Sequence, residues 1–157
     1  MRGKLTVECN PINQLISRLA AAGELLTDPP GDPAERDRQI ARVVARFPFV
    51  VQAPDWLAFL HDYGGLTYVR DGFSTGFFGV SHNASVHILD GEGDPIADGC
   101  LLICDADPPV LVGCAAFGFD ATGERRWGVY GVSEGGDTHW FAPTFTEWLE
   151  SFADAIT

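Results

Sequence analysis

Three cysteines in the middle of the chain could bind a metal or act as nucleophiles. Cys100 and Cys104 are four residues apart in the run Cys-Leu-Leu-Ile-Cys, and Cys114 follows ten residues later. Residues four apart in a strand lie on one side, so we expect Cys100 and Cys104 to share a face. Zinc-binding cysteines are usually closer together and need a second Cys or His pair nearby. Because the neighbouring residues are apolar, we interpret these cysteines as small core residues.

An acidic segment beginning at Asp90 has carboxylates at alternate positions, as a calcium-binding loop does. Its sixth position is Pro95 instead of glycine, and its twelfth is Leu101 instead of a bidentate glutamate, so we expect no specific calcium site. His82 and His87 are five apart, a spacing that suits metal binding neither in a helix nor in a strand. The sequence also lacks a Gly-Lys-Ser phosphate loop and a serine nucleophile motif. We therefore expect no catalytic residue, no metal and no cofactor.

The charge of the chain is strongly negative and unevenly distributed. The chain contains 22 acidic and 10 basic residues, which gives a net charge of −12. Residues 72–157 contain 13 acidic and only 2 basic residues, whereas residues 1–71 contain 9 and 8. Such a chain is repelled by nucleic acid and by anionic membranes, and it attracts basic proteins. The alternative interpretation is that these charges only maintain solubility.

The acidic residues expected to contact such a partner lie on turns around the expected sheet. They are Asp90, Glu92, Asp94, Asp98, Asp105 and Asp107. A row of arginines, Arg38, Arg42 and Arg46, has helical spacing and could contact phosphate or an acidic partner. In so acidic a molecule we interpret this row as a solvated face or an internal counterweight.

Four helices are expected from their start and stop signals. Asn10 and Pro11 begin the first and Gly23 ends it; Asp32, Pro33 and Glu35 predict the start of the second. The third runs from about Pro54 to Tyr63 and ends at Gly64-Gly65. In the fourth, Thr144 and Glu147 form a capping box ahead of apolar residues at helical spacing.

Short β-rich runs separated by turn residues fill the middle of the chain. We expect strands at Leu66–Val69, Gly76–Val80, Ser85–Leu89, Leu101–Cys104, Ala115–Phe119, Trp127–Val132 and Thr138–Phe141. The links at 120–124 and 134–137 read as hairpin loops, which favour antiparallel pairing. The expected fold is α+β: one antiparallel sheet with N-terminal helices (about 10–63), strands over about 66–141, and a C-terminal helix (about 144–156) packed on the sheet.

The length of 157 residues suits one domain spanning residues 1–157, and the 46% apolar content is sufficient for a core. The first residues do not show a secretory signal pattern, because Glu8, Asn10 and Pro11 interrupt the apolar run. We therefore expect a cytoplasmic protein with reduced cysteines and no membrane contact.

Two segments resemble the SUKH superfamily. The run from Phe47-Pro48 through Pro54-Asp55-Trp56 to Gly64-Gly65 is similar to its N-terminal signature, a short helix leading into a Gly-Gly turn and a strand. The run from Trp127 to Leu149 is similar to its closing strand pair and Ala-x-(Ser/Thr)-Phe-x-Glu-x-Leu helix. The motif residues are Pro54, Trp56, Phe59, Leu60, Gly64, Gly65, Phe145, Glu147, Trp148 and Leu149. The two motifs bracket about 105 residues.

The resemblance implies an α+β fold and a function without catalysis. SUKH members include fungal cell-wall-assembly regulators and bacterial immunity proteins that neutralise toxins, often nucleases or deaminases. Our first hypothesis is therefore an immunity protein that binds a basic toxin. The second is a housekeeping interaction module, with a homodimer as one form of it. The third is an unrecognised enzyme or metal protein, which zinc bound by Cys100, Cys104 and Cys114 would reveal.

Overall fold

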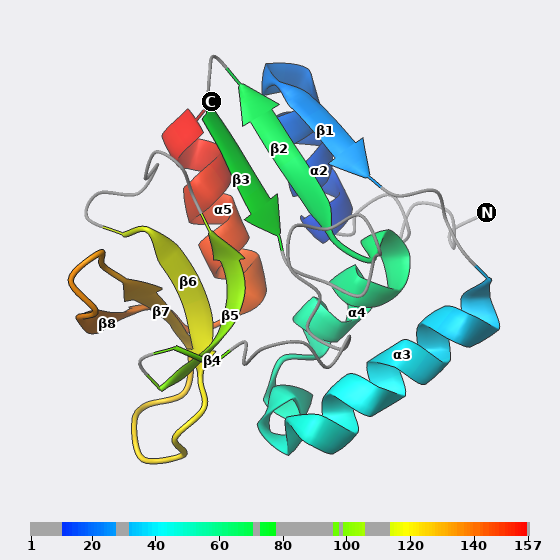
Figure 1. Cartoon of the computed structure of the whole chain (residues 1–157). Helices are drawn as coiled ribbons and strands as arrows, with labels where there is room; N and C mark the ends of the chain where they lie inside the picture. Colours follow the sequence, from blue (N-terminus) through cyan, green and yellow to red (C-terminus); the bar gives the residue numbers. More distant parts are fainter. Residues whose placement is uncertain are drawn as a thin grey trace.

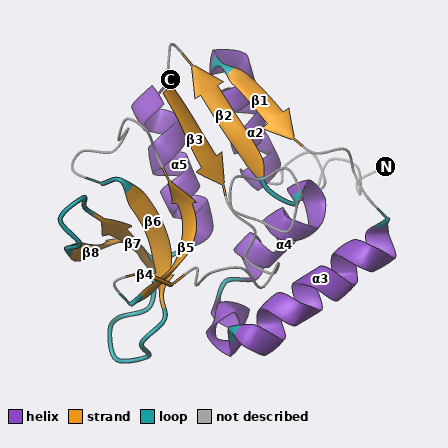
Figure 2. Ribbon diagram, in the orientation of Figure 1, coloured by secondary structure: helices purple, strands orange, loops and turns teal. Residues whose placement is uncertain are grey.

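The computed structural model describes residues 11–27, 32–70, 73–77, 96–97, 99–105 and 114–156. The helices are α2 (Pro11–Ala22), α3 (Pro33–Arg46), the 3-10 helix η1 (Pro48–Gln52), α4 (Pro54–Tyr63) and α5 (Phe145–Ile156). The strands are β1 (Glu24–Thr27), β2 (Leu66–Arg70), β3 (Phe73–Phe77), β4 (Ile96–Ala97), β5 (Cys100–Asp105), β6 (Ala116–Asp120), β7 (Val129–Val132) and β8 (Thr138–Ala142). The expected α+β class is confirmed (Figures 1 and 2).

All pairs of described strands are antiparallel, in the order β1-β2-β3-β5-β6-β7-β8, with β4 beside β5. Among the described residues, one strand pair, Phe77 with Cys104, joins β3 to β5. The sheet therefore consists of two groups, β1–β3 and β4–β8, which Figure 1 shows turned away from each other. This differs from the one regular sheet expected from the sequence.

Helices α2 and α5 lie side by side on one face of the sheet (Figure 1). Arg18 of α2 donates a hydrogen bond of 2.8 Å to Asp154 of α5. The buried face of α5 reaches both strand groups, because Phe152 contacts Tyr68 of β2 and Trp148 contacts Phe117 of β6. The rings of Trp148 and Phe152 also stack on each other, with centroids 5.8 Å apart. Helix α5 is thus the main apolar link between the two groups.

Helix α4 begins and ends where the sequence predicts. Gly64 follows it in the left-handed conformation (φ 70°), and its amide donates to the carbonyl of Leu60. Arg36 of α3 donates to the carbonyls of Leu60 and His61, which are among the last carbonyls of α4. Helix α3 is therefore attached to the end of α4 and lies on the far side of α4 from the sheet (Figure 2).

The capping predictions are confirmed in part. The side chain of Asp32 accepts from the amide of Ala34, and Thr144 accepts from the amide of Glu147. Glu35, expected to complete the first capping box, instead accepts from Arg38 at 2.6 Å. Long side chains on an exposed helix face form such i,i+3 pairs readily. Asn10 lies outside the described residues.

The strand predictions hold for β2, β5, β6, β7 and β8 within two residues at each end, and the hairpin loops at 120–124 and 134–137 connect antiparallel strands. The expected strand Gly76–Val80 begins earlier, at Phe73, and residues 78–80 and Ser85–Leu89 lie outside the described residues. Strand β1 was not predicted, because its four residues follow directly after the glycine that ends α2. It pairs with β2, so the helical N-terminal part also supplies a strand.

Nearly all the SUKH-like motif residues are structural. The core includes Trp56, Phe59, Leu60, Phe145, Trp148 and Leu149. Pro54 begins α4, Gly64 and Gly65 end it with positive φ, and Glu147 is exposed. None of the described helices is long and apolar enough to cross a bilayer.

Candidate functional site

The face of β5–β8 that points away from α5 carries a row of four residues, one from each strand. Leu102 lies opposite Gly118, Gly118 opposite Tyr130, and Tyr130 opposite Trp140. Directly opposed residues lie on the same face of a sheet. Tyr130 belongs to a second apolar cluster, separate from the main core, against which Leu102 and Trp140 pack. We call this surface the outer face of β5–β8.

Arg125, in the β6–β7 loop, contacts all four of these strands. It donates to Asp120 of β6 at 3.0 Å, to the Gly99 carbonyl next to β5 at 2.9 Å, and to Thr138 of β8 at 2.9 Å. Its guanidinium carbon also lies 4.3 Å from the ring centre of Tyr130 of β7. In a flat sheet, β5 and β8 would be about 14 Å apart, too far for one guanidinium group to bridge. The strand group is therefore curled around Arg125, with its outer face concave.

Asp120 is the charged partner of Arg125 and its side chain is only 2% exposed. Burial disfavours its ionised form, but hydrogen bonds from the hydroxyl and amide of Thr122 and from Arg125 outweigh burial. These contacts hold the pKa of Asp120 below its usual value, so it is ionised at neutral pH. The site thus contains a hydrogen-bonded buried ion pair, which fixes the loop to the strands.

Gly118 permits the curl. A Cβ atom at this position would lie 2.5 Å from the carbonyl oxygen of Leu101 and 2.9 Å from Cβ of Cys100. Both are atoms of the neighbouring strand, which cannot move aside without breaking its pairing. Only glycine therefore fits at the centre of the row.

Trp140 forms the β8 end of the row and is partly buried. Its indole nitrogen donates to the carbonyl of Trp127 at 3.1 Å, and Arg126 lies over its ring at 3.7 Å. The hydroxyl of Tyr130 donates to the Arg126 carbonyl at 2.6 Å. These contacts hold two aromatic rings and an exposed arginine in fixed positions, a combination common at the centres of protein interfaces.

Of the six acidic residues predicted to contact a partner, the structure describes Asp105. It is exposed at the end of β5, on the outer face opposite Ala116, and its carboxylate accepts from the amide of Gly76 at 3.0 Å. The other five lie outside the described residues; they are Asp90, Glu92, Asp94, Asp98 and Asp107. The structure therefore does not show whether the six lie together.

Five exposed carboxylates in the C-terminal part have no counter-ion among the described residues. Glu124, Glu134 and Asp137 lie in the two hairpin loops, and Glu147 and Glu150 lie on the solvent side of α5. Their carboxylates form no ion pair with any residue that the structure describes. The only arginines in residues 114–156, Arg125 and Arg126, are held by Asp120 and by the Trp140 ring. A negative surface potential results.

The arginine row of α3 is exposed, as its interpretation as a solvated face requires. Arg38 pairs with Glu35, and Arg46 lies over the ring of Phe47 at 4.9 Å. Part of this positive charge is therefore already engaged within α3 and its neighbour.

The expectation that Cys100 and Cys104 share a face is wrong. A register shift between Leu102 and Cys104 marks a β-bulge, which turns the following side chain to the opposite face. Cys100 thus joins the outer cluster, whereas Cys104 and Cys114 belong to the main core. No group of three or more His, Cys, Asp or Glu side chains that could hold a metal occurs within the described ranges.

Cys114 and His139 form a thiol–imidazole contact, with Sγ and Nε2 3.5 Å apart. Cys114 is fully buried, and burial raises the pKa of its thiol. Reactive cysteines have a lowered pKa and an accessible sulfur, so this pair has the properties of a structural contact.

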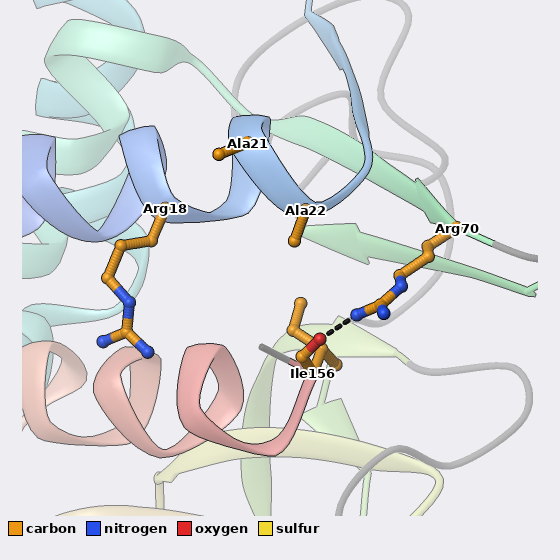
Figure 3. Close-up of a pocket in the computed structure, with 5 residues that line it drawn as sticks. All are labelled: Arg18, Ala21, Ala22, Arg70 and Ile156. Atoms are coloured by element: carbon orange, nitrogen blue, oxygen red, sulfur yellow. Dashed lines mark hydrogen bonds between the residues drawn. The ribbon is translucent and has the colours of Figure 1, made fainter.

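A shallow hollow of about 310 Å³ lies between α2, β2 and the end of α5. Figure 3 shows its lining residues, Arg18, Ala21, Ala22, Arg70 and Ile156. Arg18 pairs with Asp154, and Arg70 donates to the Ile156 carbonyl at the negative end of the α5 dipole. Both cations thus contribute to holding α5 in place.

Comparisons with models of known families, with curated proteins and with solved structures find no match to this chain. The resemblance to the SUKH superfamily therefore stays a prediction.

Proposed function

We propose that this chain is a non-catalytic protein-binding domain that neutralises a basic, nuclease-type toxin, as SUKH-like immunity proteins do. The observation that carries the proposal is the unpaired acidic surface of residues 114–156. Of the seven acidic residues there, Asp120 pairs with Arg125 and Asp154 pairs with Arg18, which leaves five exposed carboxylates. The two arginines of this part are both engaged within the outer face of β5–β8. A nuclease must present cations to hold phosphate, so an acidic surface complements it.

The exposed acids would act mainly on association. Charge complementarity raises association rates by about 10- to 1,000-fold at low salt, and the effect declines as salt screens it. Glu124, Glu134 and Asp137 are suited to this role because they lie at loop tips with their charges unpaired.

The outer face of β5–β8 would supply the contacts that slow dissociation. Trp140 and Arg126 belong to the residue types that dominate binding energies at interfaces, and Arg125 fixes the strands beneath them. Asp105 lies on the same face and adds a carboxylate beside this apolar surface.

The proposal includes a cytoplasmic location and the absence of catalysis. Cys100, Cys104 and Cys114 are buried thiols, which suits a reducing compartment. Among the described residues, the contact between Cys114 and His139 is the closest approach to a catalytic pair, and its sulfur is inaccessible.

The test is co-expression of the tagged chain with the product of the neighbouring reading frame, followed by a growth assay. We expect recovery of a basic toxin in a stable complex and protection of the cells. The variant Glu124→Gln/Glu134→Gln/Asp137→Asn should lower the association rate about tenfold at low salt and have little effect at high salt. The control, Asp37→Asn/Asp62→Asn, removes two exposed charges from the N-terminal part and should lower the rate less for each charge removed.

Recovery of an endogenous partner without growth protection would instead favour the housekeeping module. A complex whose association rate is insensitive to the triple substitution would contradict the acidic-surface mechanism.

A further inference from the structure

Strand β1 forms an outer edge of the sheet. Its four residues pair with β2 in unbroken register, from Glu24 with Val69 to Thr27 with Leu66. Within the described part of the chain no strand pairs with its other side, and Figure 1 shows it outermost in its group. Half of the backbone groups in such a strand point outward and can pair with another chain.

The opposite edge, β8, has features that hinder such pairing. Its register with β7 shifts between Val129 and Tyr130, and the strand group curls so that Thr138 meets Arg125. Bulges and strong curvature are common means of protecting a sheet edge. Strand β1 has neither feature, and its sequence Glu-Leu-Leu-Thr contains no lysine or proline.

Leu26 adds an apolar contact to this edge. It is 50% exposed, and the only other exposed large hydrophobic residue in the described ranges is Val51, at 60% on η1. Leu25, its neighbour, packs on the core. Leu26 and Glu24 therefore lie on the sheet face that points away from the helices.

We propose that β1 pairs with β1 of a second copy of this chain, antiparallel and about a two-fold axis perpendicular to the sheet. With the axis at Leu25, Leu26 of one copy lies opposite Glu24 of the other, on the same face. Each leucine then covers the aliphatic part of a glutamate, and no two like charges are directly opposed. The strand is thus complementary to itself, which is the requirement for a two-fold interface.

The dimer is weak, because four residues of strand bury less than the roughly 1,000 Å² typical of stable interfaces. Two chains of net charge −12 also repel each other. Salt screens this repulsion, so added salt strengthens the dimer. A complex between the acidic surface and a basic toxin has the opposite salt dependence, so the two proposals can fail independently.

Sedimentation velocity over a range of protein and salt concentrations tests this pairing. We expect the average mass to rise from 17.0 kDa towards twice that value as the protein concentration increases. When salt is added, this rise should occur at lower protein concentrations. Leu26→Glu places like charges directly opposite each other at the pairing with Glu24, so it should weaken the dimer at least tenfold. Val51→Glu adds the same charge at the other exposed hydrophobic residue of the described ranges and should weaken the dimer much less.

Amide hydrogen exchange of the unmodified chain gives a second readout that needs no variant. Protection that increases with concentration should be confined to β1 and its flanks. A monomer at millimolar concentration in high salt would overturn the proposal, as would equal weakening by Leu26→Glu and Val51→Glu.

Discussion

Oδ2 of Asp55 accepts hydrogen bonds from both the amide and the hydroxyl of Thr146, at 2.8 and 2.7 Å, across 91 residues of sequence. Oδ1 of the same carboxylate accepts from the amide of Trp56 in the first turn of α4. One side chain therefore satisfies amides at the starts of two helices, α4 and α5. Since both N-termini also carry partial positive charge, a carboxylate is favoured between them.

Replacement of Asp55 should destabilise the fold. Asp55→Ala removes three hydrogen bonds and should lower the free energy of unfolding by about 2–3 kcal/mol, whereas Asp55→Asn retains acceptors and should cost less. Urea denaturation followed by tryptophan fluorescence measures the change. The control Glu150→Gln, on the exposed side of α5, should stay within about 0.5 kcal/mol of the unmodified chain. Equal effects of Asp55→Ala and the control would contradict this role.

Arg125→Lys keeps the positive charge but loses the planar group that reaches Asp120, Gly99 and Thr138 together. A lysine cannot reproduce this geometry, so the free energy of unfolding should fall by about 2–4 kcal/mol. Arg42→Lys on the exposed face of α3 provides the control and should be nearly neutral. If both variants melt at the same temperature, Arg125 does not hold the strand group together.

The lowered pKa of Asp120 predicts a pH dependence. Burial opposes its ionisation, yet the hydrogen bonds from Thr122 and Arg125 keep its pKa below the unfolded value. The unfolded chain therefore binds this proton first, so the contribution of Asp120 is complete at neutral pH and declines below about pH 4. The stability difference between the unmodified chain and Asp120→Asn should accordingly be larger at pH 7 than at pH 3. A difference that is constant over this range would rule out the linkage.

Gly118→Ala tests the close approach of β5 and β6. The new methyl group would meet the Leu101 carbonyl at 2.5 Å, so we expect a loss of about 1–3 kcal/mol. Gly135→Ala is a matched control, because a Cβ there finds only Ser133 Oγ, at 3.9 Å. Thermal unfolding of the two variants side by side measures the difference, and an unaffected Gly118→Ala would mean that the strands are not curled as described.

The buried cysteines should resist alkylation in the native state. Burial, together with the charge of Asp105, raises the pKa of Cys104 well above its usual value, and burial raises that of Cys114. Both are therefore thiols at pH 8 and inaccessible to iodoacetamide. Peptide mapping by mass spectrometry should find these two sites modified in urea and protected in buffer. Native modification of Cys114 as fast as in urea would instead indicate a reactive thiol paired with His139.

The helices were predictable because their signals are local. Pro54 and Gly64 sit at the two ends of α4, and Thr144 caps α5, so a few adjacent residues determine each boundary. Strand β1 has no such signal of its own, and its pairing with β2 depends on residues about 40 positions further along the chain.

Most of the candidate site could not be predicted from the sequence, because it too depends on contacts between residues that are far apart along the chain. The importance of Arg125 depends on Gly99 and Thr138, which only the folded chain brings together. The different faces of Cys100 and Cys104 result from a bulge that strand periodicity does not reveal. The acidic character of the C-terminal half could be predicted, since it follows from counting the charged residues in the sequence.

The stacked rings of Trp148 and Phe152 have a consequence for folding cooperativity. Among the described residues, strand pairing connects the two strand groups only at Phe77 and Cys104, with one further hydrogen bond from the Gly76 amide to Asp105. These contacts alone would let each group open separately. However, Trp148 packs against β6 while Phe152 packs against β2. The two rings also stack on each other, so each one is part of the other's buried environment. Opening one group would expose aromatic surface that also packs against the other, so we expect the two strand groups to unfold in one transition.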